Sequence, residues 1–463
     1  MSQKSRQPRR DPLRSALLPE ELDRPDDLLK EEPKPTPEDS GTLGAALRRL
    51  GPGLIAGVSD DDPSNIGVYV QAGSRLGLGA LWLFLLTLPL MAAVQETCAR
   101  IALETGVGLG QTLRRKFPTA LVGLLLLALV VGNCITLGAD LSAVAAGIAL
   151  LLPFRVELIW LVVPVALLLL GMQLTMTYER IAKTFKYLTL ALLAYVVQAV
   201  LLRPDPGQLL AATFVPHLDL SHDSAMILVA VLGTTLSPYV FFWQASLLVH
   251  ERRLEGKLTE QAREHPASRV LMRARADVLL GIVVAQLVMY CLVVASAVVL
   301  HAHGKTDVPS AQQAAQALAP LAGRFASALF AAGLVGSGLL AVPVLSASSA
   351  YMVGEFFDLP GTLGTKARYR PAFYLIIAAA ILFGVVMNLL RLNPIQALVV
   401  ASVIEGIVAA PLLVLIVLLG ADASIMRRRA SGWLSRLLGW LAAAVMTLAS
   451  AYFLARLATG HGG

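Results

Sequence analysis

Long, uninterrupted runs of apolar residues constrain this chain of 463 residues more than any other feature. A helix needs about 20 such residues to cross the roughly 30 Å hydrocarbon core of a bilayer. The runs at 120–131, continuing toward residue 152, and at 158–172 are of this kind. Only 15% of the residues are charged, whereas a soluble protein has about a quarter. Because lipid offers the backbone no hydrogen bonds, these runs predict helices and an all-α integral membrane protein.

The pattern predicts about eleven transmembrane helices. A polar segment, residues 1–43, precedes them and is expected to be a disordered cytoplasmic tail, while residues 430–463 hold an extra helix beyond a core at 44–420. The predicted spans are 47–75, 78–104, 119–151, 157–176, 184–202, 224–250, 276–301, 324–353, 372–391, 394–419 and 434–457.

The basic residues indicate the orientation in the membrane. If the N-terminus is cytoplasmic, the inside loops carry roughly three times as many Lys and Arg residues as the outside loops. We therefore expect a multi-pass cell-membrane protein with a cytoplasmic N-terminus and an outside C-terminus. The net charge of +7 follows from these loops, so it does not indicate a nucleic-acid partner.

The first predicted helix is interrupted near its middle. It reads GPGLIAGVSDDDPSNIGVYVQAG, in which Asp60, Asp61 and Asp62 precede Pro63. Proline removes a backbone donor and clashes with the preceding turn, and Asp, Ser and Asn favour caps and turns over helix interiors. The segment predicts two half-helices with an unwound joint.

The sixth predicted helix is interrupted at the corresponding place, in GTTLSP at residues 233–238. Helices one and six begin two halves of five helices each, about 44–205 and 220–420. Five is odd, so the halves have opposite orientations. A broken first helix in each half is typical of an inverted-repeat transporter whose site lies at the midplane.

The residues at the two breaks predict a metal site. A carboxylate at the bilayer centre is costly, so Asp62 is a functional candidate. Asn65 adds a neutral oxygen, and Thr234 and Ser237 add hydroxyl or backbone oxygens. Oxygen ligands suit hard cations such as Mg²⁺, Ca²⁺ and Mn²⁺. For the neighbouring carboxylates, Asp60 and Asp61, the expectation is a place facing a vestibule or a role in capping the half-helix.

At these residues the chain resembles the Nramp family of divalent metal transporters. The resemblance lies in GPGLIAG, DPSN and QAG of the first helix, LLTLPLMAAVQETCARIALETG of the second and GADLSAVAAGIAL of the third, and it covers about residues 44–420. It implies a LeuT-type fold and import of Mn²⁺ or Fe²⁺, usually coupled to protons. The family's aspartate and asparagine ligands in helix one map onto Asp62 and Asn65.

The chain also departs from that family. Its helix six has Ser237 and Tyr239 on either side of the proline, where the family has methionine and histidine, and Gln244 takes the place of a second histidine. Asp140 is kept in helix three, but Ala143 replaces a glutamate, and the family's arginine pair in helix nine is absent from residues 372–390. Loss of a soft ligand removes a preference for transition metals, and loss of His and Glu removes proton carriers.

These departures resemble those of the divergent, Nramp-related magnesium transporters, and they imply carriage of Mg²⁺ or Mn²⁺ without proton coupling. A proton-coupled Mn²⁺/Fe²⁺ importer is the alternative. Glu405 lies in an apolar stretch of helix ten. It could contribute to the ion path or act as a proton site, or it could form a hydrogen bond between helices, and the sequence favours neither role. Gln396 is a weaker candidate for the outer path, and Asp140 is expected to support a polar network inside the protein.

Other functions are less well supported by the sequence. A sodium-coupled organic-solute symporter has the same fold, but an anionic substrate would be repelled by the aspartate at the first break. A metal sensor remains a further alternative. The chain contains no HExxH, GxSxG or phosphate-binding glycine loop, so we expect neither an enzyme nor a cofactor. The expected partners are the transported divalent ion and the lipid bilayer, and the oligomeric state is open.

Overall fold

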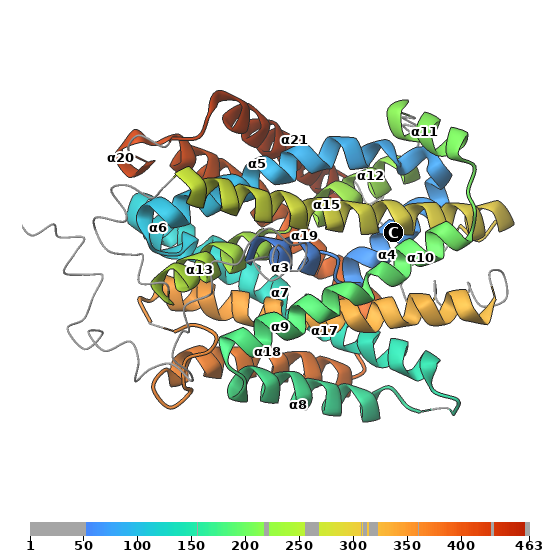
Figure 1. Cartoon of the computed structure of the whole chain (residues 1–463), viewed down its shortest axis with the longest axis horizontal. Coiled ribbons are helices and arrows are strands. Elements are labelled where there is room, and N and C mark those ends of the chain that lie inside the picture. The colour runs from blue at the N-terminus through green and yellow to red at the C-terminus, as the bar shows by residue number, and fades with distance from the viewer. Residues whose placement is uncertain are drawn as a thin grey trace, which may run out of the picture.

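The computed structural model describes residues 52–154, 156–216, 222–254, 268–306, 308, 313, 323–359, 361–426 and 430–458. Within these residues every regular element is a helix, and most helices run along one common direction (Figure 1). The polar segment at 1–43, predicted to be disordered, lies outside the described residues.

The described helices account for the predicted membrane spans. Eight spans are long and apolar enough to cross a bilayer as single helices. A ninth span, α8 (Ile159–Thr175), is apolar but shorter, and the two remaining spans each consist of two half-helices. The eight are formed by α5 (Trp82–Thr105), α7 (Thr119–Leu151), α9 with α10 (Tyr178–Ala191, Leu193–Leu201), α15 (Ser268–Val299), α17 (Arg324–Phe356), α18 (Pro371–Leu389), α19 (Pro394–Ala421) and α21 (Trp433–Ala458). Eight, one and two give the eleven spans that the sequence predicts.

The first break lies between α3 (Pro52–Ser59) and α4 (Pro63–Leu76). The amides of Asp60 and Asp61 each donate to the carbonyl three residues earlier, at 3.3 Å. Such bonds tighten the last turn of a helix, and they satisfy carbonyl groups at its C-terminal end that would otherwise have no partner within the helix. The chain therefore leaves α3 within the acidic run.

The second half-helix begins with a proline and a capping aspartate. Pro63 occupies the first turn of α4, where its missing N–H would have no partner in the helix anyway. Asp62 is the N-cap, and its side chain accepts from the Asn65 amide at 2.8 Å. The unwound joint predicted from the sequence is confirmed.

The second break separates α12 (His222–Thr235) from α13 (Pro238–Leu254). Pro238 opens the new helix, as Pro63 does in the first half. The Ser237 hydroxyl donates to the Thr234 carbonyl at 2.7 Å, so a side chain satisfies a backbone oxygen that the break would otherwise leave free.

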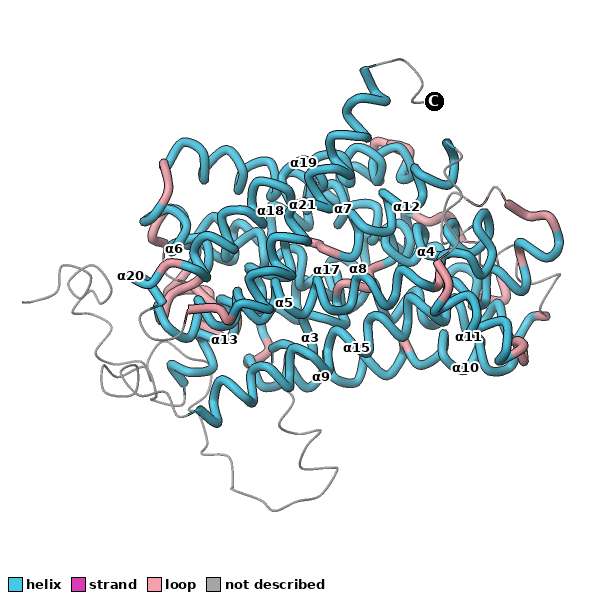
Figure 2. Tube along the Cα trace, turned by 90° about the horizontal axis from the view of Figure 1, so that it is seen from above, coloured by secondary structure: helices cyan, strands magenta, loops and turns pink. Residues whose placement is uncertain are grey.

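The two halves pack reciprocally. The first helix of each half lies on the second helix of the other, because α3 and α4 contact α15 while α12 and α13 contact α5. The two third helices, α7 and α17, contact each other, as do the two fourth helices, α8 and α18. Figures 1 and 2 show α7 and α17 running through the middle of the bundle. This pattern is typical of an inverted repeat, whose limits at 44–205 and 220–420 stay predictions.

Glycines bring α3 very close to α15. A Cβ atom on Gly57 would lie 2.4 Å from the carbonyl carbon of Gly281, and one on Gly281 would lie 2.4 Å from the Gly53 oxygen. Small residues allow such backbone contact between membrane helices. Asp277 of α15 also accepts from the Gly53 amide at 2.7 Å, which caps the start of α3.

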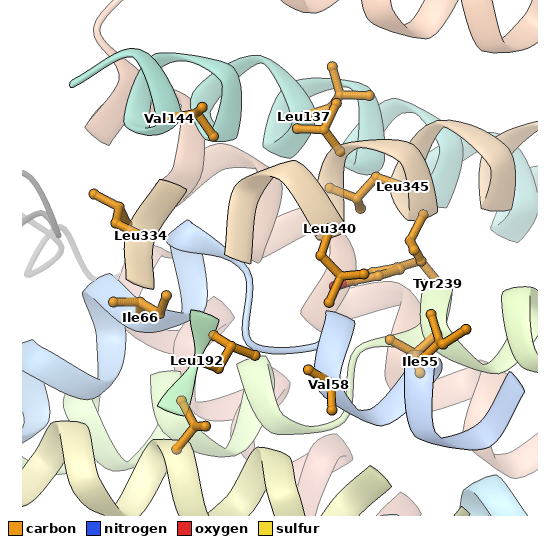
Figure 3. Close-up of a cluster of buried hydrophobic side chains, with 14 of the residues drawn as sticks. Ile55, Val58, Ile66, Leu137, Val144, Leu192, Tyr239, Leu334, Leu340 and Leu345 are labelled. Carbon is orange, nitrogen blue, oxygen red and sulfur yellow. The ribbon is translucent and has the colours of Figure 1, made fainter. Parts of the chain in front are cut away.

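Apolar side chains enclose the first joint. Figure 3 shows Ile55, Val58 and Ile66 from its two half-helices within one buried apolar cluster, with Tyr239 near Ile55, Leu192 near Val58 and Leu334 near Ile66, and all three are 2% exposed or less. The joint therefore lies in a water-poor part of the protein, which makes the placement of its polar groups significant.

Some local features were not predicted from the sequence. Two short helices, α6 (Leu109–Lys116) and α11 (Pro206–Phe214), follow the second and fifth spans, and the fifth span is interrupted at Leu192. The remaining short elements are η3 (Gly77–Ala80), η4 (His301–His303) and α20 (Ala423–Met426).

Candidate metal site at the two helix breaks

Asp62 lies at the start of α4 and is 1% exposed. Its Oδ1 accepts from the Asn65 amide at 2.8 Å and from the Ser64 hydroxyl, and its Oδ2 accepts from the Tyr239 hydroxyl at 3.2 Å. A carboxylate offers about four acceptor positions. These donors fix the orientation of the group and leave capacity for a cation.

Asn65 connects the two broken helices. Its Nδ2 donates to the carbonyl of Asp60 at 2.5 Å and to the carbonyl of Thr234 at 3.2 Å. The amide nitrogen is therefore occupied by one carbonyl from each joint. Its Oδ1 is the atom that can coordinate a cation.

Helix six contributes backbone and hydroxyl oxygens. The Thr234 hydroxyl is directed to its own helix, where it donates to the Val231 carbonyl at 3.1 Å, while the Thr234 carbonyl faces Asn65 and Ser237. The Ser237 side chain also lies beside the carboxylate of Asp60. The structure therefore brings together Asp62, Asn65, Thr234 and Ser237, with Thr234 presenting its carbonyl oxygen.

Tyr239 links α13 to the end of α3. Its hydroxyl lies 3.0 Å from the Ser59 carbonyl and 3.2 Å from Asp62 Oδ2, so one proton is shared between two acceptors. Its own carbonyl accepts from the Ser348 hydroxyl of α17 at 2.8 Å. The tyrosine at the position after the proline thus belongs to the hydrogen-bond network of the site.

Asp60 and Asp61 are not where the sequence analysis placed them. Each is 1% exposed, so neither faces an open vestibule, and the capping residue is Asp62. Asp60 faces Ser237, and in the described part of the chain its Oδ1 has no hydrogen-bond partner. The expectation was wrong because an unwound joint has no period from which side-chain directions can be read.

A second acidic group lies between α7 and α19. The Thr136 hydroxyl of α7 donates to Glu405 Oε1 at 3.1 Å, and the Glu405 side chain packs against Gly132. One turn along α7, Asp140 is fully buried and lies near the backbone of Ser64 at the first joint. Asp140 and Glu405 both interact electrostatically with Asp62, so the polar network continues from the first joint into this pair.

The two remaining candidates lie further away. Gln244, seven residues beyond Ser237, donates to the Gln95 carbonyl at 3.4 Å, and both glutamine side chains are 1% exposed or less. Gln95 is a buried polar residue that the sequence analysis missed, although a lone amide within an apolar helix was the available signal. Gln396 is exposed and precedes Glu405 by nine residues, or about 13 Å along a helix.

The charge at the joint favours a cation. Asp60, Asp61, Asp62 and Asp140 are each 1% exposed or less, and burying a carboxylate without a counter-charge costs several kcal/mol. Within the described residues no group of three His, Cys, Asp or Glu side chains forms a ready metal cage. A cation at the joint would meet carboxylates together with neutral oxygens, a set that suits a partly hydrated hard cation.

The sequence pattern described as "Natural resistance-associated macrophage protein-like" matches residues 53–456. The chain belongs to the Nramp family. The resemblance stated from the first three helices is thereby confirmed, and the matched range includes both breaks and every candidate site residue named above.

Curated relatives of this Nramp chain match it over most of its length. It is 27% identical over 431 residues to the divalent metal cation transporter MntH of Deinococcus radiodurans, covering 91% of this chain and 93% of that protein. It is 26% identical over 416 residues to the MntH protein of Aeromonas hydrophila, covering 88% and 95% of the two chains.

Solved structures show the same fold. The Eremococcus coleocola manganese transporter, in complex with an aromatic bis-isothiourea compound, matches with a TM-score of 0.69 at 18% identity, over 92% of this chain and 89% of that one. A nucleobase-cation-symport-1 family transporter in a closed conformation matches with a TM-score of 0.55 at 14% identity, over 89% and 94%. The Nramp chain is thus a multi-pass membrane protein with the predicted LeuT-type fold.

Proposed function

We propose that this chain is a secondary transporter that carries Mg²⁺ and Mn²⁺ across the cell membrane by alternating access. The ion would bind between the joints of α3/α4 and α12/α13, with Asp62, Asn65, the Thr234 carbonyl and Ser237 as its protein ligands. Membership in the Nramp family and similarity to the MntH relatives, which are divalent metal cation transporters, support the class of substrate.

The proposed choice of ion rests on the chemistry of the ligands. Residues 59–65 and 233–239 contain no Met, Cys or His, so the two joints present only oxygen to the ion. Such a set does not favour soft transition metals over hard cations. Mg²⁺ gives up its water reluctantly, and a site with few protein carboxylates accommodates an ion that keeps part of its water.

The proposed orientation places the N-terminus in the cytoplasm and the C-terminus outside, from the distribution of basic loops. In this orientation α4 and α12 form the outer halves of the broken helices, and α3 and α13 form the inner halves. An ion entering from outside would pass beside α4 and α12 and leave beside α3 and α13.

Uptake of radioactive Mn²⁺ into proteoliposomes tests this proposal. We expect saturable uptake that excess Mg²⁺ inhibits and that a proton gradient neither drives nor accelerates. Mn²⁺ uptake insensitive to Mg²⁺ would contradict the choice of ion, and absence of divalent uptake would contradict the function itself.

The second candidate function is a proton-coupled Mn²⁺/Fe²⁺ importer. It is favoured by the buried Asp140 and the partly buried Glu405, two acids close enough to Asp62 to interact with it. Its signature in the same assay is Mn²⁺ uptake that accelerates when the outside is acidified, accompanied by acidification of the vesicle interior.

A further inference from the structure

The loop between α17 and α18 carries three basic residues that no carboxylate neutralises. Lys366, Arg368 and Arg370 alternate with uncharged residues, and in the described part of the chain none of the three forms an ion pair. Residues 356–404 contain one acid, Asp358, and its carboxylate pairs with a cation of α6 instead. The loop therefore presents an uncompensated positive charge.

The neighbouring helix α6 shows the contrast. Its Arg114 pairs with Asp358 at 2.8 Å, and its Lys116 pairs with Asp422, just before α20. Figure 1 shows α6, α20 and the start of α18 at the same end of the bundle. At this end two cations of α6 find their anions within the protein, whereas the three cations of the loop remain free to bind an anion from outside it.

The loop is held in place from both adjoining helices. The Tyr351 hydroxyl of α17 lies 2.9 Å from the Thr362 hydroxyl and accepts from the Leu363 amide at 3.1 Å. The Tyr374 hydroxyl of α18 donates to the Thr365 carbonyl at 2.7 Å, and the Leu363 side chain is fully buried. A loop that is already ordered loses little conformational entropy when it binds a ligand.

The side chain of Arg368 is oriented by a stacking contact. Its guanidinium carbon lies 4.6 Å from the centroid of the Tyr369 ring, and its Nη2 donates to the Tyr369 hydroxyl at 2.8 Å. Both side chains are exposed. A guanidinium group has five N–H donors in a planar fork, so most of them stay available, and this fork matches the oxygens of a phosphate.

The exposed apolar side chains of α18 locate the loop relative to the lipid. Leu375, Leu382 and Val386 recur at helical spacing and are each 40% exposed or more, so this face of the span contacts the acyl chains. Arg370 precedes Leu375 by five residues, or about 8 Å along a helix. The headgroup layer is about 5–8 Å thick on each side of the hydrocarbon, and the exposed ring of Tyr369 is typical of this layer. The cations therefore lie at the level of the lipid phosphates.

We propose that Lys366, Arg368 and Arg370 form a binding site for the phosphate of an anionic phospholipid of the phosphatidylglycerol type. Basic residues at the membrane surface attract anionic lipids, and a lipid brings its phosphate to this level together with acyl chains that cover the exposed face of α18. A zwitterionic lipid would leave the positive charge of the loop uncompensated. The site lies apart from the two helix breaks and does not depend on the proposed function.

Thermal melting of the purified full-length protein in detergent micelles tests this inference. The micelles contain phosphatidylglycerol or phosphatidylcholine at equal concentration, and a third sample contains inorganic phosphate without lipid. We expect a saturable rise in the melting temperature with phosphatidylglycerol alone. The triple variant Lys366→Gln, Arg368→Gln, Arg370→Gln should weaken the apparent affinity for phosphatidylglycerol by about tenfold or more, and Arg368→Gln alone by about fivefold.

The matched control removes the same charge elsewhere. The triple variant Arg203→Gln, Lys305→Gln, Arg391→Gln changes three exposed cations outside the loop, and it should respond to phosphatidylglycerol as the wild type does. In phosphatidylcholine all variants should melt at the wild-type temperature, which shows that they are folded.

Four outcomes would overturn the inference. A wild type that does not respond to phosphatidylglycerol has no such site, and an equal response to phosphatidylcholine shows that charge is not recognised. An equal response to inorganic phosphate shows that the loop binds a free anion and not a lipid. An equal loss of affinity in the two triple variants shows that only the overall charge of the protein matters.

Discussion

Replacing Ser237 by cysteine should change which metals the protein prefers. Ser237 is 4% exposed and lies at the second break, where its hydroxyl donates to the Thr234 carbonyl at 2.7 Å and its side chain lies beside Asp60. Cysteine has nearly the same shape but offers a soft sulphur and a weak donor. Sulphur ligands favour soft metal ions over Mg²⁺.

The expected changes in stability and in metal preference follow from the loss of one hydrogen bond and the replacement of one oxygen ligand by sulphur. Loss of the hydrogen bond to Thr234 should cost roughly 1 kcal/mol of stability. One sulphur ligand should improve inhibition of Mn²⁺ uptake by Cd²⁺ at least tenfold, which corresponds to about 1.4 kcal/mol, while inhibition by Mg²⁺ stays the same or weakens.

Competition by Cd²⁺ and Mg²⁺ against radioactive Mn²⁺ uptake in proteoliposomes measures this change. Ser246→Cys is the matched control, because Ser246 is also buried in α13 and donates to the Phe242 carbonyl at 2.8 Å, nine residues beyond Ser237. If both variants show the same sensitivity to Cd²⁺, Ser237 is not a ligand and the reasoning fails.

Three other substitutions test the surroundings of the site. Tyr239→Phe leaves the Ser59 carbonyl and Asp62 Oδ2 without their shared donor and should lower stability by about 1–3 kcal/mol. Melting curves should show a larger loss than for Tyr290→Phe, whose hydroxyl pairs with Thr213 elsewhere, and an equal loss would count against the shared bond. Gly57→Ala should destabilise the protein by about 1–3 kcal/mol, because the added Cβ atom would meet the Gly281 backbone. Gly171→Ala is the control, since a Cβ atom there has open space and should not change stability. Equal melting temperatures of the two variants would refute the close contact. Glu405→Gln keeps an acceptor for Thr136 but removes a charge that interacts with Asp62, so the KM for Mn²⁺ uptake should rise about threefold or more, without a change in pH dependence. A lost pH dependence would instead favour the proton-coupled alternative.

The fold was largely predictable because the strongest physical constraint, the need of the backbone to form its own hydrogen bonds in lipid, acts on long segments. Apolar runs set the spans. Pro63 and Pro238 marked both breaks because turn-forming Asp, Ser, Thr or Gly residues stand beside them, whereas Pro89 and Pro343 lie inside unbroken helices. The short helices α6 and α11 were missed because they are only 8 and 9 residues long and lie outside the apolar runs. The interruption at Leu192 carries no glycine or proline signal.

The site was predictable only where residues sit next to a helix end. Asp62 and Asn65 follow from the capping geometry at Pro63, and Ser237 follows from its place before Pro238. The directions of Asp60 and Asp61 did not follow, because side chains in an unwound joint are placed by elements distant in sequence, as α13 does for Asp60. The pairing of Gln95 with Gln244 also depends on contact between α5 and α13, which no local pattern encodes.

Mn²⁺ uptake by Asp62→Asn tests the central claim most directly, with Asp205→Asn as its control. Both aspartates are N-caps followed by proline, so the two changes cost a similar capping interaction, but only Asp62 is buried at the joint. The account predicts that uptake falls at least tenfold in Asp62→Asn and stays at the wild-type rate in Asp205→Asn, with both proteins folded. Wild-type uptake by Asp62→Asn would contradict it.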